Sequence, residues 1–154
     1  MMRVRGPRKL IETTQGAGLL IGARDDGLEQ AVRSIRLGGE IRIDRARSAR
    51  ELRRLLVPSG LLPHEVDDLA VKIVVLDDDL DTEEGALGLI RELVALRPSL
   101  KVIWVTGSLD RNREIEARRL GVYYIVPRPL EPTLLSRVIT KAVEHETTRV
   151  RKTG

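Results

Sequence analysis

The sequence predicts an α/β fold, in which helices cover both faces of one doubly wound, five-stranded parallel sheet. Short apolar runs alternate with amphipathic segments five times along the 154 residues, which is the pattern of strands joined by crossover helices. The run 73–76 is apolar throughout and ends in three carboxylates, Asp77, Asp78 and Asp79. A strand buried on both faces has this composition and delivers polar side chains to the rim of its sheet.

The first strand and helix are predicted between residues 19 and 38. Residues 19–21 have the pattern of a short buried strand. Apolar residues then recur at helical spacing and predict an amphipathic helix over 26–37, which Gly38-Gly39 would end. The apolar face of this helix consists of Leu28, Ala31, Val32 and Ile35.

The second unit begins with a half-exposed edge strand, because Ile41 and Ile43 alternate with polar residues. Ser48 is a favourable helix N-cap, with Glu51 at the reciprocal capping-box position. The apolar face of the helix that follows consists of Leu52, Leu55 and Leu56. Residues 57–68 contain two prolines and a glycine and are predicted to be a loop.

The last three strands are predicted at 71–76, 101–106 and 123–127. Helices follow them: one ends near Arg97-Pro98, a charged one over 113–120 is closed by Gly121, and a third begins at Pro132. Five such units suit the flavodoxin-like strand order 2-1-3-4-5. We therefore expect a basic extension over 1–17, one domain over 18–146 and a basic tail over 147–154.

Composition narrows the class of protein. There is no Cys and no Phe, so the core must be aliphatic and neither disulfides nor thiolate metal sites are possible. No apolar run approaches the roughly 20 residues that span a bilayer, and no secretory signal is visible, so a cytoplasmic protein is expected. Much of the +4 net charge lies in the two ends. Because no aromatic residues interleave with these arginines, nucleic-acid binding is not expected.

Three strand ends carry a candidate site. Asp77, Thr106 and Arg128 end or follow the third, fourth and fifth predicted strands. In parallel sheets of this order the site lies beyond the carboxyl ends of the strands, where the first and third strands meet. That edge also receives Asp25 and Asp26, which follow the first strand.

This spacing resembles that of response-regulator receiver domains over residues 18–145. Leu80 and Gly85 lie three and eight places after Asp77, and Arg128-Pro129-Leu130 begins 22 residues after Thr106. The resemblance implies that Asp77 accepts a phosphoryl group from a histidine kinase, with Mg²⁺ bound by neighbouring acids. It also implies that Thr106 and Arg128 contact the phosphoryl oxygens.

The sequence departs from the family's pattern at the metal site and at the switch residue. Setting the first helix on the family's pattern places Ala23 and Arg24 where the family has its metal-binding acidic pair. Arg128 replaces the family's lysine. The family's aromatic switch position holds Ile125, with Tyr124 one place earlier.

Formal charge favours an atypical receiver. If the other acids point away, Asp77 faces Arg24 and Arg128 with a net charge of +1, which repels Mg²⁺. At about 4 Å and an effective dielectric near 20, one such pair of charges is worth about 4 kcal/mol before desolvation. We expect Asp77 to pair with Arg24, Arg128 or both, because a guanidinium can grip a carboxylate with two hydrogen bonds. The domain would then act through protein contacts without a cofactor.

Three alternatives remain. In a phosphorylatable receiver, Asp25 and Asp26 would assist Asp77 and Asp79 in binding Mg²⁺. In a haloacid-dehalogenase-like phosphatase, which the Asp77-x-Asp79 motif also resembles, Asp77 would be the nucleophile and Asp79 a general acid. The third is a nucleic-acid-binding regulator that uses the basic ends.

A protein partner is the expected ligand, either a histidine kinase or a downstream signalling protein of bacterial type. The mixed-charge helix around Ile115 belongs to the surface that receiver domains use for partners. A homodimer through residues 110–146 would use the same surface. We expect neither enzymatic activity nor association with a membrane.

Overall fold

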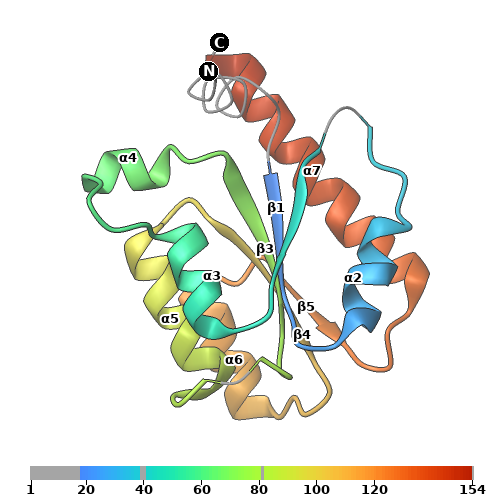
Figure 1. Ribbon diagram of the computed structural model, residues 1–154. Coiled ribbons are helices and arrows are strands. Elements are labelled where there is room, and N and C mark those ends of the chain that lie inside the picture. The colour runs from blue at the N-terminus through green and yellow to red at the C-terminus, as the bar shows by residue number, and fades with distance from the viewer. Residues whose placement is uncertain (1–17, 39–40, 81, 154) are drawn as a thin grey trace.

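A five-stranded parallel sheet forms the centre of the computed structural model, which describes residues 18–38, 41–80 and 82–153. Its strand order, β2-β1-β3-β4-β5, is the predicted one. The strands are β1 (Gly18–Gly22), β2 (Ile43–Ala46), β3 (Val71–Asp77), β4 (Lys101–Thr106) and β5 (Tyr124–Pro127). All of their pairings are parallel, so all carboxyl ends lie at one edge, the lower one in Figure 1.

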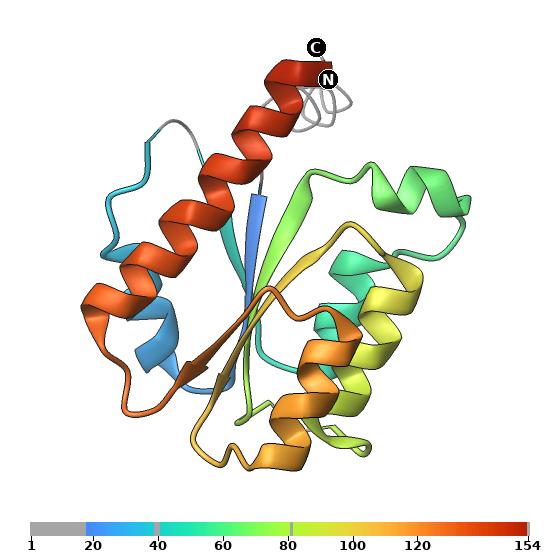
Figure 2. The ribbon, with the colours of Figure 1, turned by 180° about the vertical axis from the view of Figure 1, so that it is seen from behind.

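Helices cover both faces of the sheet, as Figures 1 and 2 show from opposite sides. On one face lie α2 (Asp26–Arg33) and α7 (Pro132–Thr153). The other face carries α3 (Ala49–Leu56), α5 (Gly85–Leu96) and α6 (Arg111–Leu120). The short helix α4 (Pro63–Asp67) precedes β3.

Strand β3 contributes side chains to both core layers, which explains its unbroken apolar run. Ile73 and Val75 pack in the layer beneath α2 and α7, whereas Val74 and Leu76 pack in the layer beneath α3, α5 and α6. All four are essentially inaccessible to solvent. The second layer also holds Trp104, a large aromatic side chain that is fully buried in an otherwise aliphatic core.

Two predictions about local structure were wrong. The helix predicted over 26–37 ends at Arg33, because the Ser34 hydroxyl donates to the Ala31 carbonyl at 2.8 Å and competes with helix continuation. The loop predicted over 57–68 contains α4. Its first turn begins at Pro63, and the Glu65 carboxylate accepts the Leu62 N–H at 2.8 Å.

Smaller corrections concern β2 and α3. The edge strand begins at Ile43, two residues later than predicted. Ser48 caps α3 as predicted, but the Glu51 carboxylate accepts the N–H of Arg47 and not that of Ser48. Leu55, expected on the packed face of α3, is 43% exposed.

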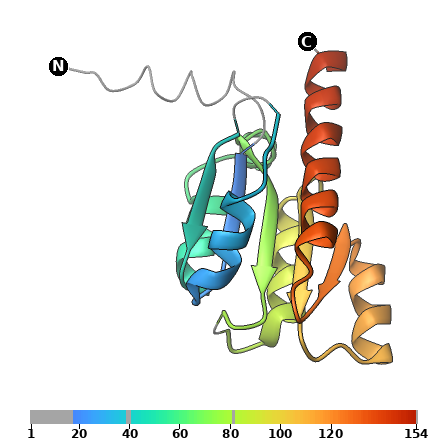
Figure 3. The ribbon, with the colours of Figure 1, turned by 90° about the vertical axis from the view of Figure 1, so that its right-hand side faces the viewer.

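Helix α7 continues without a break past residue 146, the expected end of the domain, to Thr153. Figure 3 shows it lying along the sheet and extending beyond it at the end opposite the strands' carboxyl edge. Buried Glu146 pairs with Lys101 at the start of β4 and anchors the helix there. Among the described helices, none is both long enough and apolar enough to cross a membrane.

Arg97 connects two elements at the edge of the sheet opposite the strands' carboxyl ends. Its side chain is fully buried, and its guanidinium donates to the carbonyls of Leu56, at the end of α3, and Val71, at the start of β3. Backbone carbonyls that are buried need donors. One arginine thus joins the end of α3 to the start of β3.

Replacing Arg97 with alanine is expected to lower the free energy of unfolding by about 3 kcal/mol, since it leaves buried carbonyls without donors and opens a cavity. Urea denaturation measures the change. The matched control is Arg91→Ala, which breaks an ion pair on the surface: the Arg91 side chain is 60% exposed and that of its partner Glu116 is 40% exposed. This variant should cost less than about 1 kcal/mol of unfolding free energy. Equal losses in the two variants would contradict the assigned role of Arg97.

Candidate functional site

The predicted strand-end residues converge at the carboxyl edge of the sheet. Asp77 ends β3 and Thr106 ends β4, in neighbouring strands. The backbone N–H of Arg128, just after β5, donates to the Thr106 carbonyl at 3.0 Å. The Arg128-Pro129 peptide bond is cis. Parallel pairing aligns strand ends, so spacing in the sequence was sufficient to predict this convergence.

Asp77 pairs with Arg128. The Arg128 guanidinium donates to Oδ2 of Asp77, whose side chain is only 3% exposed, while that of Arg128 is 37% exposed. The N–H of Asp79 approaches Oδ1 at 3.4 Å. The expected pair between Asp77 and Arg128 is therefore present. The expected pair between Asp77 and Arg24 is not, since no contact joins the two described side chains.

Burial dominates the electrostatics of Asp77. Desolvation raises the pKa of its carboxyl group, the Arg128 hydrogen bond and charge oppose this, and the nearby charge of Asp79 raises it further. The ionised carboxylate is thus less favourable in the fold than in water, even with an arginine beside it.

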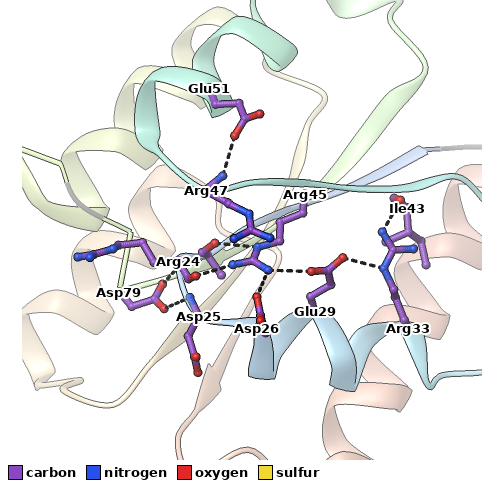
Figure 4. A network of polar contacts seen from close by, with 11 residues as sticks. Arg24, Asp25, Asp26, Glu29, Arg33, Ile43, Arg45, Arg47, Glu51 and Asp79 are labelled. Atoms are coloured by element: carbon purple, nitrogen blue, oxygen red, sulfur yellow. Dashed lines mark hydrogen bonds and ion pairs between the residues drawn. The ribbon is translucent and has the colours of Figure 1, made fainter.

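Asp79 links the loop that follows β3 to the loop that follows β1 (Figure 4). Its Oδ1 accepts the N–H of Arg24 at 3.0 Å and its Oδ2 accepts the N–H of Asp25 at 2.9 Å. Both carboxylate oxygens are therefore occupied by the loop that follows β1. These two hydrogen bonds fix the backbone at Arg24, whose side chain is exposed and extends past Asp79 in Figure 4.

Arg45 holds the same loop from the other side. Its guanidinium donates to the carbonyls of Ala23 and Arg24 and to the carboxylates of Asp26 and Glu29. The Arg45 side chain is only 5% exposed. Its hydrogen bonds lower the pKa of both carboxyl groups. Sequence reasoning missed Arg45; its position at the end of an edge strand beside an acidic loop was the available signal.

Asp78 is the centre of a second cluster that the sequence did not reveal. Its carboxylate accepts the Thr106 hydroxyl and, at 2.7 Å, the indole N–H of Trp104. The Arg113 guanidinium lies 3.7 Å from Asp78 and stacks over the Trp104 ring at 4.9 Å from its centroid. The Thr106 hydroxyl therefore serves Asp78 and not Asp77, and Asp78 links the sheet edge to α6.

The two residues of the expected switch region lie on β5. Ile125 pairs in register with Trp104 and packs against the core layer beneath α6. Tyr124 is 42% exposed and lies beside Ile103 in the sheet register.

The residues present do not fit the Mg²⁺ site that the resemblance implied. In the part of the chain that the structure describes, no three Asp, Glu or His side chains gather as metal ligands. Asp26 is held by Arg45, Asp77 by Arg128 and Asp79 by backbone N–H groups, while Asp25 is exposed at the start of α2. The occupied oxygens of Asp79 also disfavour its role as the general acid of a phosphatase.

Replacing Asp77 with asparagine is expected to raise the melting temperature by a few degrees, roughly 1 kcal/mol in unfolding free energy, since it removes a desolvated charge. A carboxyl group whose folded pKa is raised destabilises the fold when ionised. The advantage of Asp77→Asn should therefore be largest at neutral pH and disappear as the pH falls through the folded pKa towards the unfolded value.

Calorimetry from neutral to acid pH tests this expectation. Asp44→Asn is the control, because the Asp44 side chain is 43% exposed and pairs with Arg42 on the surface. A lower melting temperature for Asp77→Asn at neutral pH would show that the pair with Arg128 outweighs the burial of Asp77.

Replacing Asp78 with alanine should cost about 2–3 kcal/mol of unfolding free energy, since two buried donors lose their acceptor. Asp78→Asn keeps one acceptor oxygen and should cost less. Urea denaturation followed by Trp104 fluorescence gives both the free energies and the emission of the folded state. If Asp78→Ala changes neither the stability nor the emission, Asp78 does not hold the cluster together.

Comparison with known proteins finds the same architecture among solved structures. No protein-family model and no curated protein matches the chain. Among solved structures, a response regulator receiver domain protein from Clostridium thermocellum is 18% identical, with a TM-score of 0.66 over 86% of this chain and 98% of that chain. The signal receiver domain of a DNA-binding response regulator (merR) from Colwellia psychrerythraea 34H is 23% identical, with a TM-score of 0.65 over 83% and 98%.

A third match is a putative pilus assembly protein (cpaE) from Burkholderia thailandensis E264. It is 27% identical, with a TM-score of 0.61 over 83% of this chain and 98% of that chain. The chain thus has the fold of response-regulator receiver domains, as the spacing of Asp77, Thr106 and Arg128 had indicated.

Proposed function

We propose that the chain is a receiver-like signalling module that works through protein contacts and not through Mg²⁺-assisted phosphorylation of Asp77. One observation carries the proposal: four carboxylates at the carboxyl edge are already engaged by donors of the protein itself. Arg45 binds Asp26, Arg128 binds Asp77, Thr106 and Trp104 bind Asp78, and the loop after β1 binds Asp79.

Loading such a site with Mg²⁺ would require these contacts to break. Mg²⁺ needs hard oxygen ligands in near-octahedral geometry. Releasing Asp26 would break its pair with Arg45, and Asp79 would have to leave two backbone donors. The ion would also stand near the Arg128 guanidinium, where repulsion between charges is worth several kcal/mol at short range.

The arrangement also supports a signalling role over a catalytic one. Neither Asp77 nor Asp79 is free to act as nucleophile or acid, since each is held by neighbouring groups. Asp78 meanwhile contacts Arg113 of α6. Exposed apolar side chains lie just before this helix, on it and on β5: Leu109, Ile115 and Tyr124. In this proposal a cytoplasmic signalling protein reads that surface. A homodimer through residues 110–146 remains a prediction.

The matched structures comprise receiver domains of response regulators and a putative pilus assembly protein. The proposal draws on their shared fold, so it names a class of partner, a signalling protein, and no pathway.

Trp104 allows the proposal to be tested, because the chain contains one tryptophan and its indole lies in the Asp78 cluster. Titration with millimolar MgCl2 and beryllofluoride, which mimics a phosphoryl group, should produce no saturable change in Trp104 fluorescence. The chain should likewise gain no phosphoryl adduct in intact-mass spectra after incubation with acetyl phosphate.

The control is Asp77→Asn under the same conditions. A saturable change, or a phosphoryl adduct, that is present in the native chain and absent from Asp77→Asn would overturn the proposal. It would establish the phosphorylatable receiver in its place.

A further inference from the structure

We propose that the outer face of α3 is a docking surface for an acidic, partly apolar segment of a partner protein. Three arginines, Arg47, Arg50 and Arg54, form this surface, here called the basic stripe. The inference rests on the proposed function, since it names one surface and one partner class for a module that works through protein contacts.

The helix places the three arginines together and away from the core. Ala49, Leu52 and Leu56 are buried against the sheet. Arg50 and Arg54 are four residues apart and share the opposite side of the helix, and Arg47 lies just before the N-cap Ser48, between β2 and α3. All three are exposed.

Acidic neighbours pair with many of the other arginines but not with these. Arg53, on the same helix, pairs with both Glu84 and Glu92. Similar pairs join Arg33 to Glu29, Arg91 to Glu116 and Arg118 to Glu114. Within the described ranges, by contrast, no carboxylate forms an ion pair with Arg47, Arg50 or Arg54.

The stripe is unfavourable for the isolated fold. Like charges four residues apart on a helix repel each other. Arg50 also lies in the first turn of α3, where the helix dipole favours acidic residues and disfavours cations. Because Arg50 and Arg54 weaken the helix and form no ion pair with a described carboxylate, they suit an external anion.

The neighbouring side chains favour an acidic protein segment over a polyanion. Leu55 is 43% exposed beside the stripe, and exposed Leu61 and Leu62 follow in the next loop. These leucines would contact apolar side chains of a partner. Glu51, on the same helix, would repel a continuous array of phosphates, and α3 offers no aromatic side chain on which a base could stack.

The stripe adjoins the candidate site. Arg47 directly follows β2 at the carboxyl edge of the sheet, and its charge reaches the Asp26 carboxylate. Figure 4 shows Arg47 beside Arg45 and the loop that follows β1. A partner on the stripe would therefore lie near the Arg45 network, at the β2 end of the face that α3, α5 and α6 cover, whereas the surface of α6 and β5 lies at the β5 end.

The test uses the full chain and a labelled synthetic helical peptide with glutamates on one face and leucines on the other. Fluorescence anisotropy at two salt concentrations measures binding. The double variant Arg50→Glu/Arg54→Glu should weaken binding about tenfold or more, through lost attraction and new repulsion. The matched control, Arg36→Glu/Arg137→Glu, changes two other exposed arginines by the same charge and should weaken binding less than about twofold.

Thermal melting shows that the stripe variant is folded. Its melting temperature should stay within about 2 °C of the native value, since a glutamate suits the helix dipole at position 50 but not at position 54, and one like-charge pair replaces another. The single variant Arg50→Glu removes the repulsion and suits the dipole, so a melting temperature below the native value for it would contradict the argument that Arg50 destabilises α3.

Three outcomes would overturn the inference: no binding of the peptide, equal weakening in stripe and control variants, or tighter stripe-dependent binding of duplex DNA or phosphatidylserine vesicles. Failure here is distinguishable from failure of the proposed function. Titration of Arg50→Glu/Arg54→Glu with MgCl2 and beryllofluoride, followed by Trp104 fluorescence, reports on the site around Asp77 whatever the stripe binds.

Discussion

The gathering of acidic side chains at one edge of a parallel sheet is the constraint on which this structure depends. Parallel pairing brings Asp77, Asp78 and Asp79 to the edge that also receives the loop after β1. The chain compensates the acidic edge with its own cations: Arg128 after β5 pairs with Asp77, Arg113 of α6 lies near Asp78, and Arg45 of β2 pairs with Asp26. In each of these contacts the arginine and the acid belong to different elements. The contacts that neutralise the acidic edge therefore also hold the elements around it together.

Sequence reasoning reached the fold and the convergence of Asp77, Thr106 and Arg128, because hydrophobic periodicity fixes strands and parallel pairing aligns their ends. It could not assign partners within the edge. Consecutive residues Asp77, Asp78 and Asp79 point in different directions, and spacing alone does not tell which carboxylate meets Thr106.

Arg24 and Arg45 show the same limit. A count of formal charge is correct about the presence of guanidinium groups near the acids, but a backbone hydrogen bond decides where each one points. Asp79 fixes the backbone at Arg24, and Arg45 reaches across from the edge strand to occupy Asp26. Helix α4 was missed for a related reason, since two prolines outweighed a single first-turn glutamate in the pattern.

The acids at the edge belong to two separate clusters, one around Asp77 and one around Asp78. Asp77 acts on Arg128 and hence on the segment between β5 and α7, whereas Asp78 acts on Thr106, Trp104 and α6. A change of charge at Asp77 would thus be felt first by Arg128. The contact between Asp78 and Arg113 is one of the links that hold α6, beside its packing on the core and the ion pair of Glu116 with Arg91. Asp78 therefore helps to hold α6 with a charge that needs no phosphorylation, as the proposed function requires.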